Sequence, residues 1–188
     1  MSKRLKRKFF ARPTLVVAKD LLGKYLVRKI GKEILAGKIV ETEAYIGPFD
    51  RASHAFGGKV TPRNKAEYLI GGHVYIYLVY GMYWQLNITT APAGRPECVL
   101  IRSLEPKNVD FHLTNGPGKL CRFLKLDKSF YAEDLTSSSR LWLEDRGVRI
   151  VLSQIISSPR IGIDYAGPIW SKKPWRFYLS DSPAVSRQ

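Results

Sequence analysis

Cysteine, histidine and acidic residues are scarce in this sequence. Its 188 residues include two Cys, three His, and sixteen Asp and Glu against thirty-one Lys and Arg. Two cysteines cannot build a disulfide framework, and the scattered cysteines and histidines lack zinc-ligand spacing. No apolar run approaches the ~20 residues that a membrane-spanning helix needs. We therefore expect no metal site and no membrane segment.

Basic charge is abundant instead. The formal net charge is +15 and the pI is about 9.9. This excess favours a polyanionic partner, most commonly nucleic acid, although a solubilising basic surface or affinity for acidic lipid would produce it too. The first twenty residues lack the apolar core and cleavage site of a signal peptide. We expect residues 1–8 to form a flexible basic arm that contacts phosphate, with a nuclear or organellar address as the alternative.

The length of the chain suits one domain with a substantial core. No repeat or linker interrupts it, so we expect residues 9–188 to form a single domain. Apolar periodicity and turn residues predict helices at residues 12–23 and 119–126 and strands at 24–30, 33–46, 73–80, 83–90, 97–104, 141–144, 148–156, 160–163 and 175–179. Strands outnumber helices without regular βαβ alternation, which indicates a mostly antiparallel α+β fold.

Acidic residues gather in one stretch, "VETEAYIGPFDRASHAF", at residues 40–56. Alternate side chains of a strand share a face, so we expect Glu41, Glu43 and Tyr45 on one face. Taken alone, this pattern favours an exposed edge strand with harmless acids. The Tyr45 ring supports the alternative that Glu43 lies in the low-dielectric surroundings that suit a general base.

The segment "HVYIYLVYGMYWQLNI", residues 73–88, predicts two strands that turn at Gly81. A cross-strand aromatic pair that merely stabilises the hairpin explains Tyr75 or Tyr83 well. Tyr80 is different, because a ring beside Gly81 at the hairpin tip has little to pack on. On a basic protein, an exposed ring at such a tip suggests a wedge between bases.

Three basic residues have two interpretations each. Arg102 ends the apolar run "CVLI", where it either emerges into solvent or pairs with a carboxylate of the Glu41 and Glu43 strand. Lys59 and Arg63 lie in the loop "GGKVTPRN", which either binds phosphates or is a solvated basic loop.

Taken together, these stretches resemble the alkyladenine (3-methyladenine) DNA glycosylase family of the mammalian type, also called methylpurine DNA glycosylases. The resemblance extends from about Phe9 nearly to the C-terminus and includes "ETEAY", "TPRN", "YGMY", "NGPGKL" and "RIGIDYAGP". The combination of these blocks is highly specific, whereas each block alone is weak. The segment at 107–114 is shorter than usual for the family, and the long N-terminal extension of mammalian members is missing, so the chain resembles a compact bacterial form.

The resemblance implies catalytic roles for three residues. Glu43 matches the general base that activates a water for attack on C1′ of the nucleotide. Arg102 matches the arginine that helps to hold this base and the water. Ile161 matches a position whose backbone carbonyl completes the water site. The family needs neither a metal nor a cofactor and lacks lyase activity, so we expect the same of this chain.

The resemblance also implies how a base is held. Tyr45, His54 and Tyr77 match the aromatic walls around the extruded base, where the main chain at His54 also binds its edge. Asn87 matches the residue that rejects guanine by crowding its 2-amino group, and Tyr80 matches the ring that fills the gap left in the duplex. Contacts with the DNA backbone are expected from Lys59, Arg63, Met82 and Tyr83.

The implied fold is a curved, barrel-like sheet with flanking helices and a protruding β-hairpin that inserts into DNA. The implied activity is base excision repair on double-stranded DNA, with hydrolysis of the N-glycosidic bond of 3-methyladenine, and with 7-methylguanine, hypoxanthine and ethenoadenine as further candidates. We expect a monomer without an obligate protein partner, cytoplasmic in a bacterium or nuclear in a eukaryote. A non-catalytic module that stacks single-stranded bases and an RNA-modifying enzyme are the alternatives.

Overall fold

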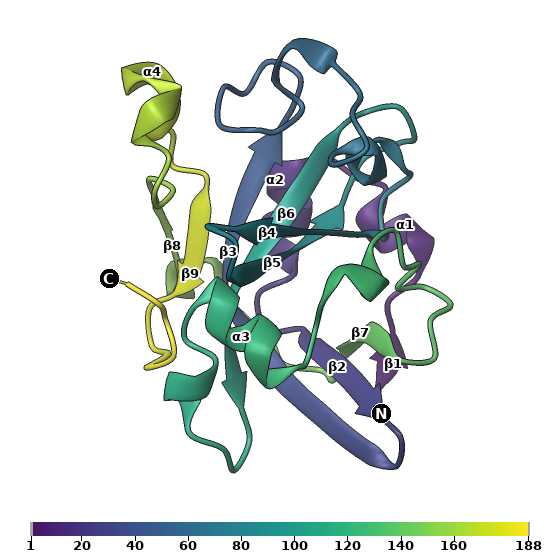
Figure 1. Ribbon diagram of the computed structural model, residues 1–188. Helices are drawn as coiled ribbons and strands as arrows, with labels where there is room; N and C mark the ends of the chain where they lie inside the picture. The colour runs from purple at the N-terminus through teal and green to yellow at the C-terminus, as the bar shows by residue number, and fades with distance from the viewer. Residues whose placement is uncertain (1, 188) are drawn as a thin grey trace.

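A large antiparallel sheet organises the molecule (Figure 1). The computed structural model describes residues 2–187. Within that range there are four α-helices and nine strands. The helices are α1 (Arg7–Phe10), α2 (Thr14–Asp20), α3 (Pro117–Phe123) and α4 (Pro168–Ser171). The strands are β1 (Lys3–Arg4), β2 (Tyr25–Ile30), β3 (Glu33–Ile46), β4 (Val74–Val79), β5 (Tyr83–Thr89), β6 (Glu97–Pro106), β7 (Leu141–Asp145), β8 (Ile155–Ser158) and β9 (Arg176–Leu179).

The strands follow the order β1-β7-β2-β3-β6-β5-β4, with β9 paired to β3 and β8 paired to β9. All of these pairings are antiparallel. The sheet is curled, but among the described strands the two ends of this path, β1 and β4, do not pair, so the sheet is not a closed barrel (Figure 1). The predicted α+β fold with a curved, mostly antiparallel sheet is confirmed.

Strand β3 is the centre of this arrangement. One side of it pairs with β6, while the other side pairs first with β2 and then, towards its end, with β9. The register with β6 shifts between Ile39 and Thr42. A bulge of this kind bends a strand and increases its twist, which allows one strand to belong to two differently oriented parts of a sheet.

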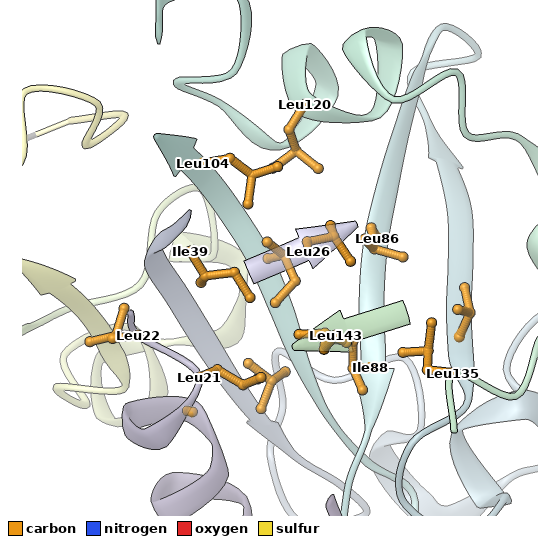
Figure 2. Close-up of a cluster of buried hydrophobic side chains, with 14 of the residues drawn as sticks. Leu21, Leu22, Leu26, Ile39, Leu86, Ile88, Leu104, Leu120, Leu135 and Leu143 are labelled. Atoms are coloured by element: carbon orange, nitrogen blue, oxygen red, sulfur yellow. The ribbon is translucent and has the colours of Figure 1, made fainter. Parts of the chain in front are cut away.

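The main hydrophobic core lies between the sheet and the helices α2 and α3 (Figure 2). Leu21, directly after α2, and Leu120 of α3 are completely buried in one cluster with Leu26, Ile39 and Leu86 of the sheet. Burial of each such side chain contributes about 1.5–3 kcal/mol. This core holds β3, β5 and β6 in place, and those strands carry most of the site described below.

Both predicted helices are present, but α2 is shorter than predicted, and α3 begins two residues and ends three residues earlier than predicted. Pro13 lies directly before α2, and Pro117 lies in the first turn of α3. Proline fits at a helix start because the N–H that it lacks would have no helical acceptor there. No helix within residues 2–187 has the length and apolar character needed to cross a membrane.

The short connection after β6 is tied back to that strand. The Thr114 hydroxyl donates to the Leu104 carbonyl at 2.7 Å, and the Leu104 N–H donates to the Thr114 carbonyl at 3.2 Å. Thr114 is completely buried. The reduced length of residues 107–114 therefore leaves a well-anchored loop.

The beginning of the chain is not a flexible arm, contrary to the sequence prediction. Lys3 and Arg4 pair with β7, and the N–H of the buried Leu5 donates to the Leu143 carbonyl at 2.9 Å. The basic composition of this segment concealed Leu5, the one apolar side chain among its described residues 2–8. Met1 in the expected arm, and Gln188 at the end of the expected domain, lie outside the described residues.

Two predicted strands near the C-terminus are also wrong. Of residues 148–156 only the last two belong to a strand, β8, and residues 160–163 form a loop. Ile150 anchors the first segment by packing against the core and the backbone at Gly23 instead of pairing in the sheet. Gly162, with a φ of +74°, turns the chain away from an extended path. The predicted strands at 141–144 and 175–179 are present as β7 and β9.

Candidate active site

Glu41 and Glu43 lie deep inside the protein. Both are completely buried, and at these residues β3 is not an edge strand, because it pairs with β6 along one edge and with β9 along the other. The interpretation of this stretch as an exposed edge strand is therefore wrong. Two carboxylates without solvent contact need compensating cations or hydrogen bonds, and each of them has both.

Arg102 is shared between the two acids. Its Nε lies 3.0 Å from Oε1 of Glu41, and its Nη1 lies 3.3 Å from Oε1 of Glu43. Only 7% of Arg102 is exposed, so it does not emerge into solvent. Desolvation acts to lower the pKa of Arg102, but the carboxylates of Glu43 and Glu41 outweigh it and raise the pKa overall. The guanidinium therefore stays charged between the two carboxylates.

Glu43 is oriented by two further groups. The backbone N–H of Ile161 donates to its Oε1 at 2.8 Å, and the Tyr45 hydroxyl donates to its Oε2 at 2.9 Å. Burial, followed by the neighbouring charge of Glu43, raises the pKa of Tyr45, so this hydroxyl remains a donor. Ile161 thus reaches Glu43 through its N–H, and the predicted role of its carbonyl in completing the water site stays a prediction.

A second buried ion pair positions Ile161. Arg160 donates to both carboxylate oxygens of Asp50, at 2.5 and 2.9 Å, and to the Ala44 carbonyl at 2.9 Å. Arg160 and Asp50 are both almost completely buried, and the guanidinium lies 4.7 Å from the centre of the Tyr45 ring. Sequence analysis missed Arg160, because its partner is 110 residues away and no local pattern links them.

The residues around Glu43 face a cleft of about 630 Å³. The cleft is lined by all three groups that hold Glu43, by aromatic rings and by the hairpin: Tyr45, His54, Arg63, Tyr77, Leu78, Val79, Tyr80, Gln85, Leu100, Arg102, Ile161, Gly162, Ile163 and Tyr165. A small inner pocket of about 40 Å³ shares Tyr45, His54, Tyr77 and Tyr165 with the cleft. The structure therefore brings the three predicted aromatic walls together around one space.

His54 is held within this aromatic group. Its ring meets Tyr77 edge to face with 4.5 Å between centroids, and its Nδ1 lies 2.6 Å from the Tyr75 hydroxyl. Desolvation, followed by the charge of Arg63, lowers the pKa of His54 to about 4. The imidazole is therefore neutral near pH 7, and it can stack without adding charge to the pocket.

Asn87 does not line the cleft. It is 1% exposed, its amide donates to the Gln85 carbonyl at 3.3 Å, and its side-chain oxygen lies 3.8 Å from the Cys98 sulphur. Gln85, two residues earlier in β5, lines the cleft in its place. The expected rejection of guanine by Asn87 stays a prediction.

Tyr80 lies at the tip of the β4–β5 hairpin, at the rim of the cleft. It is 88% exposed with a φ of +51°, and Met82 across the turn is also exposed. Tyr80 is thus no core residue, while its insertion into DNA stays a prediction. Tyr83 is partly exposed and lies against Gly118 of α3.

The two basic loop residues differ in their surroundings. Lys59 is exposed, and no salt bridge to it is found within residues 2–187. Arg63 lies at the mouth of the cleft with its guanidinium 5.3 Å from the centre of the Tyr77 ring. Contact with DNA phosphates stays a prediction for both.

Several residues of the site were not found from the sequence. Tyr165 lines both the cleft and the inner pocket and donates to the Ala52 carbonyl at 3.2 Å, and Arg176 lies 2.7 Å from Oε1 of Glu41. Glu67 lines the inner pocket. Among the residues that the structure describes, no group of three or more His, Cys, Asp and Glu side chains is placed to hold a metal ion.

The chain is similar to one family of known proteins over nearly its whole length. The family described as "Methylpurine-DNA glycosylase (MPG)" matches residues 8–183. The putative 3-methyladenine DNA glycosylase of Borreliella burgdorferi is 46% identical over 189 residues, which cover 97% of this chain and 99% of that protein. The corresponding protein of Desulfitobacterium hafniense is 43% identical, with 98% of each chain covered. The DNA-3-methyladenine glycosylase of Mus musculus is 41% identical over 98% of this chain and 62% of its own length.

Proposed function

The chain belongs to the methylpurine-DNA glycosylase family, and from that membership we propose a base excision repair glycosylase whose Glu43 activates a water to hydrolyse the N-glycosidic bond of a damaged purine. The observation that carries the proposal is the placement of Glu43 directly behind an aromatic cleft. All three groups that hold its carboxylate, namely Tyr45, Arg102 and Ile161, line that cleft.

The carboxylate of Glu43 keeps capacity for a further hydrogen bond. A carboxylate offers about four lone-pair sites. Arg102 and Ile161 approach Oε1, and Tyr45 donates to Oε2, so a second site on Oε2 can accept a proton from water. A positioned general base of this kind contributes about 10²–10⁴-fold to a hydrolysis rate. The water attacks C1′ of the sugar, the bond to the purine nitrogen breaks, and an abasic site remains.

The cleft suits a purine that has left the base stack. Extrusion from a duplex costs a few kcal/mol, and stacking on aromatic side chains returns roughly 1–3 kcal/mol per base. Tyr45, His54 and Tyr77 supply such rings around one space. Alkylation at N3 makes adenine cationic, and electron-rich rings attract a cation. These properties favour 3-methyladenine, with 7-methylguanine, hypoxanthine and ethenoadenine as further substrates to test.

The exterior suits double-stranded DNA. A net charge of +15 attracts the phosphate backbone independently of sequence. The exposed Tyr80 at the hairpin tip can fill the gap that an extruded nucleotide leaves in the duplex. The cleft that Tyr80 borders lies beside the hairpin, so one protein surface would open the duplex and receive the base.

A monofunctional reaction fits the cleft. Cleavage of the abasic site by a lyase requires an amine nucleophile that forms a Schiff base. Within the described residues, no lysine lines the cleft. We therefore expect hydrolysis to end at the abasic site.

The test is incubation of the protein with duplexes that each contain one modified purine, scored for abasic sites. We expect release from at least one of them, no strand cleavage, and loss of release in Glu43→Gln. Binding to single strands without release from any duplex would contradict the proposal and favour a binding module. Release from modified RNA alone would favour an RNA-modifying enzyme.

A further inference from the structure

The inner pocket ends on a buried acid that the proposed reaction does not use. Glu67 belongs to the short 3₁₀ helix Lys65–Tyr68, is 1% exposed, and lines the pocket with Ser53, Tyr75 and Cys98. The volume of about 40 Å³ exceeds the ~10–15 Å³ needed for a single water. It can therefore hold an exocyclic group at the end of a base.

Glu67 has an unused hydrogen-bonding atom. The Ser53 hydroxyl donates to Oε2 at 3.4 Å, but Oε1 is buried without any hydrogen-bond partner within residues 2–187. Leaving a buried polar atom unpaired costs about 1–3 kcal/mol, and such atoms are rare in native proteins. An unpaired oxygen beside a pocket is expected where a polar ligand binds and supplies the missing hydrogen bond.

Burial also sets the protonation state of Glu67. Desolvation raises its pKa to about 8, against the smaller lowering effects of the Tyr75 and Ser53 hydroxyls and of Arg63. The carboxyl is therefore mostly neutral near pH 7. A neutral carboxyl offers both an O–H donor and a carbonyl acceptor, whereas a carboxylate can only accept.

The other titratable groups around Glu67 do not change protonation state between about pH 7 and pH 9. The pKa of His54 is lowered to about 4, and burial raises the pKa values of the surrounding hydroxyl and thiol groups, so only Arg63 is charged. These hydroxyl and thiol groups belong to Tyr45, Tyr68, Tyr75, Tyr77, Cys98, Tyr131 and Tyr165. Glu67 is thus the one group of this pocket that changes charge near pH 8.

The shape of a purine directs one edge towards Glu67. The glycosidic bond at N9 must lie beside Glu43, and the part of a purine farthest from N9 carries N1 and the substituent at position 6. Tyr45, His54 and Tyr77 line both the cleft and the inner pocket, so a base stacked among them extends from one to the other.

We propose that Glu67 determines specificity by hydrogen bonding to the position-6 substituent of the extruded purine. The inference rests on the glycosylase function proposed above. A 6-oxo purine such as hypoxanthine accepts a hydrogen bond, so it requires the protonated carboxyl. A 6-amino purine such as 3-methyladenine donates to Oε1, which accepts in both protonation states. Glu67 therefore permits both substrate classes near neutral pH and only the 6-amino class above its pKa.

The test compares single-turnover excision of hypoxanthine and of 3-methyladenine at about pH 7 and about pH 9, on either side of the Glu67 pKa. For the wild type, the ratio of hypoxanthine to 3-methyladenine excision should fall about tenfold, since a net hydrogen bond is worth roughly that factor. In Glu67→Gln the fall should disappear, because an amide keeps its donor at both pH values. Any fall caused by titration of the base itself would persist in this variant.

Two further variants complete the test. Glu67→Leu, which can neither donate nor accept, should lower excision of both bases about tenfold and abolish the pH effect on their ratio. Glu33→Gln, at the exposed start of β3, serves as a carboxylate control and should behave as wild type. Thermal unfolding of every variant establishes the folded fraction by which excision is divided.

The outcomes separate the two proposals. An equal ratio at both pH values in the wild type, or unchanged excision by Glu67→Leu, would overturn the role of Glu67 while leaving the glycosylase intact. The wild-type comparison requires no variant, so poor folding of a variant cannot obscure it. Absence of release of any modified purine by the wild type would overturn the proposed function and, with it, this inference.

Discussion

Glu41 and Glu43 make a natural comparison, because they lie two residues apart on one face of β3 and both are completely buried. Glu41 is bound by two arginines, Arg102 and Arg176, and by the backbone N–H of Ser186 near the C-terminus. Glu43 shares Arg102 with Glu41, and it accepts hydrogen bonds from the backbone N–H of Ile161 and from the Tyr45 hydroxyl. Burial and a paired charge are common to both residues, so they do not by themselves distinguish the proposed general base.

What distinguishes Glu43 is the position of its partners. Tyr45, Arg102 and Ile161 all line the cleft, whereas of the Glu41 partners only Arg102 does so. Glu41 links β3 to β9 and to the C-terminal segment, which is a structural role. Glu43 is held by groups that line the cleft proposed to receive the base.

The largest effect on stability is expected from Glu41→Gln. The substitution removes the charge that compensates Arg176 and part of Arg102, and breaking a buried pair in this way typically costs about 3–5 kcal/mol. Urea unfolding of the variant against wild type measures the loss. A loss below about 1 kcal/mol would contradict the structural role of Glu41.

Substitution of Arg102 and of Arg176 should have different effects on excision, because the two arginines contact the two acids differently. Arg102→Gln removes the contact with Glu43, so excision per folded molecule should fall roughly 10–100-fold, the value of hydrogen bonds to charged groups. Of the two acids, Arg176 contacts only Glu41, so Arg176→Gln is the matched control, although it also loses hydrogen bonds to Ser158 and to two backbone carbonyls. Its excision per folded molecule should stay within about threefold of wild type while its stability falls. Equal losses of excision in both variants would remove the distinction between the two acids.

The smallest change in stability is expected at the hairpin tip. Tyr80→Ala alters a side chain that is 88% exposed, and such surface changes usually lie within about ±0.5 kcal/mol. Excision should nevertheless fall, most for a damaged base that is well paired and least for one opposite a mismatch, where extrusion is already easy. Thermal unfolding and single-turnover excision measure the two effects. A large drop in melting temperature with unchanged excision would rule out the wedge.

The part of the site predicted from the sequence is the part that depends on local periodicity. Alternation along a strand correctly placed Glu43 and Tyr45 on one face, and Gly81 correctly marked the turn that exposes Tyr80. The parts that failed depend on distant partners. Arg160 pairs with an acid 110 residues away, and residues 160–163 form a loop around that ion pair rather than the predicted strand.

Glu67 is a second residue whose surroundings could not be predicted from the local sequence. Its sequence context, "RNKAEYL", has two basic residues shortly before Glu67 and gives no sign of burial. Only the folded chain places Glu67 behind three aromatic rings with an unpaired oxygen. The burial and the raised pKa of such an acid depend on tertiary packing, which local composition does not predict.

The most direct measurement is single-turnover excision by Glu43→Gln and Glu41→Gln on the same modified duplex, at saturating enzyme and divided by the folded fraction of each variant. Glu43→Gln should bind the duplex as the wild type does and excise at least about two orders of magnitude more slowly. Glu41→Gln should excise within about tenfold of wild type, since its main loss is stability. Near-normal excision by Glu43→Gln, or a deeper loss in Glu41→Gln, would contradict the assignment of Glu43 as the base.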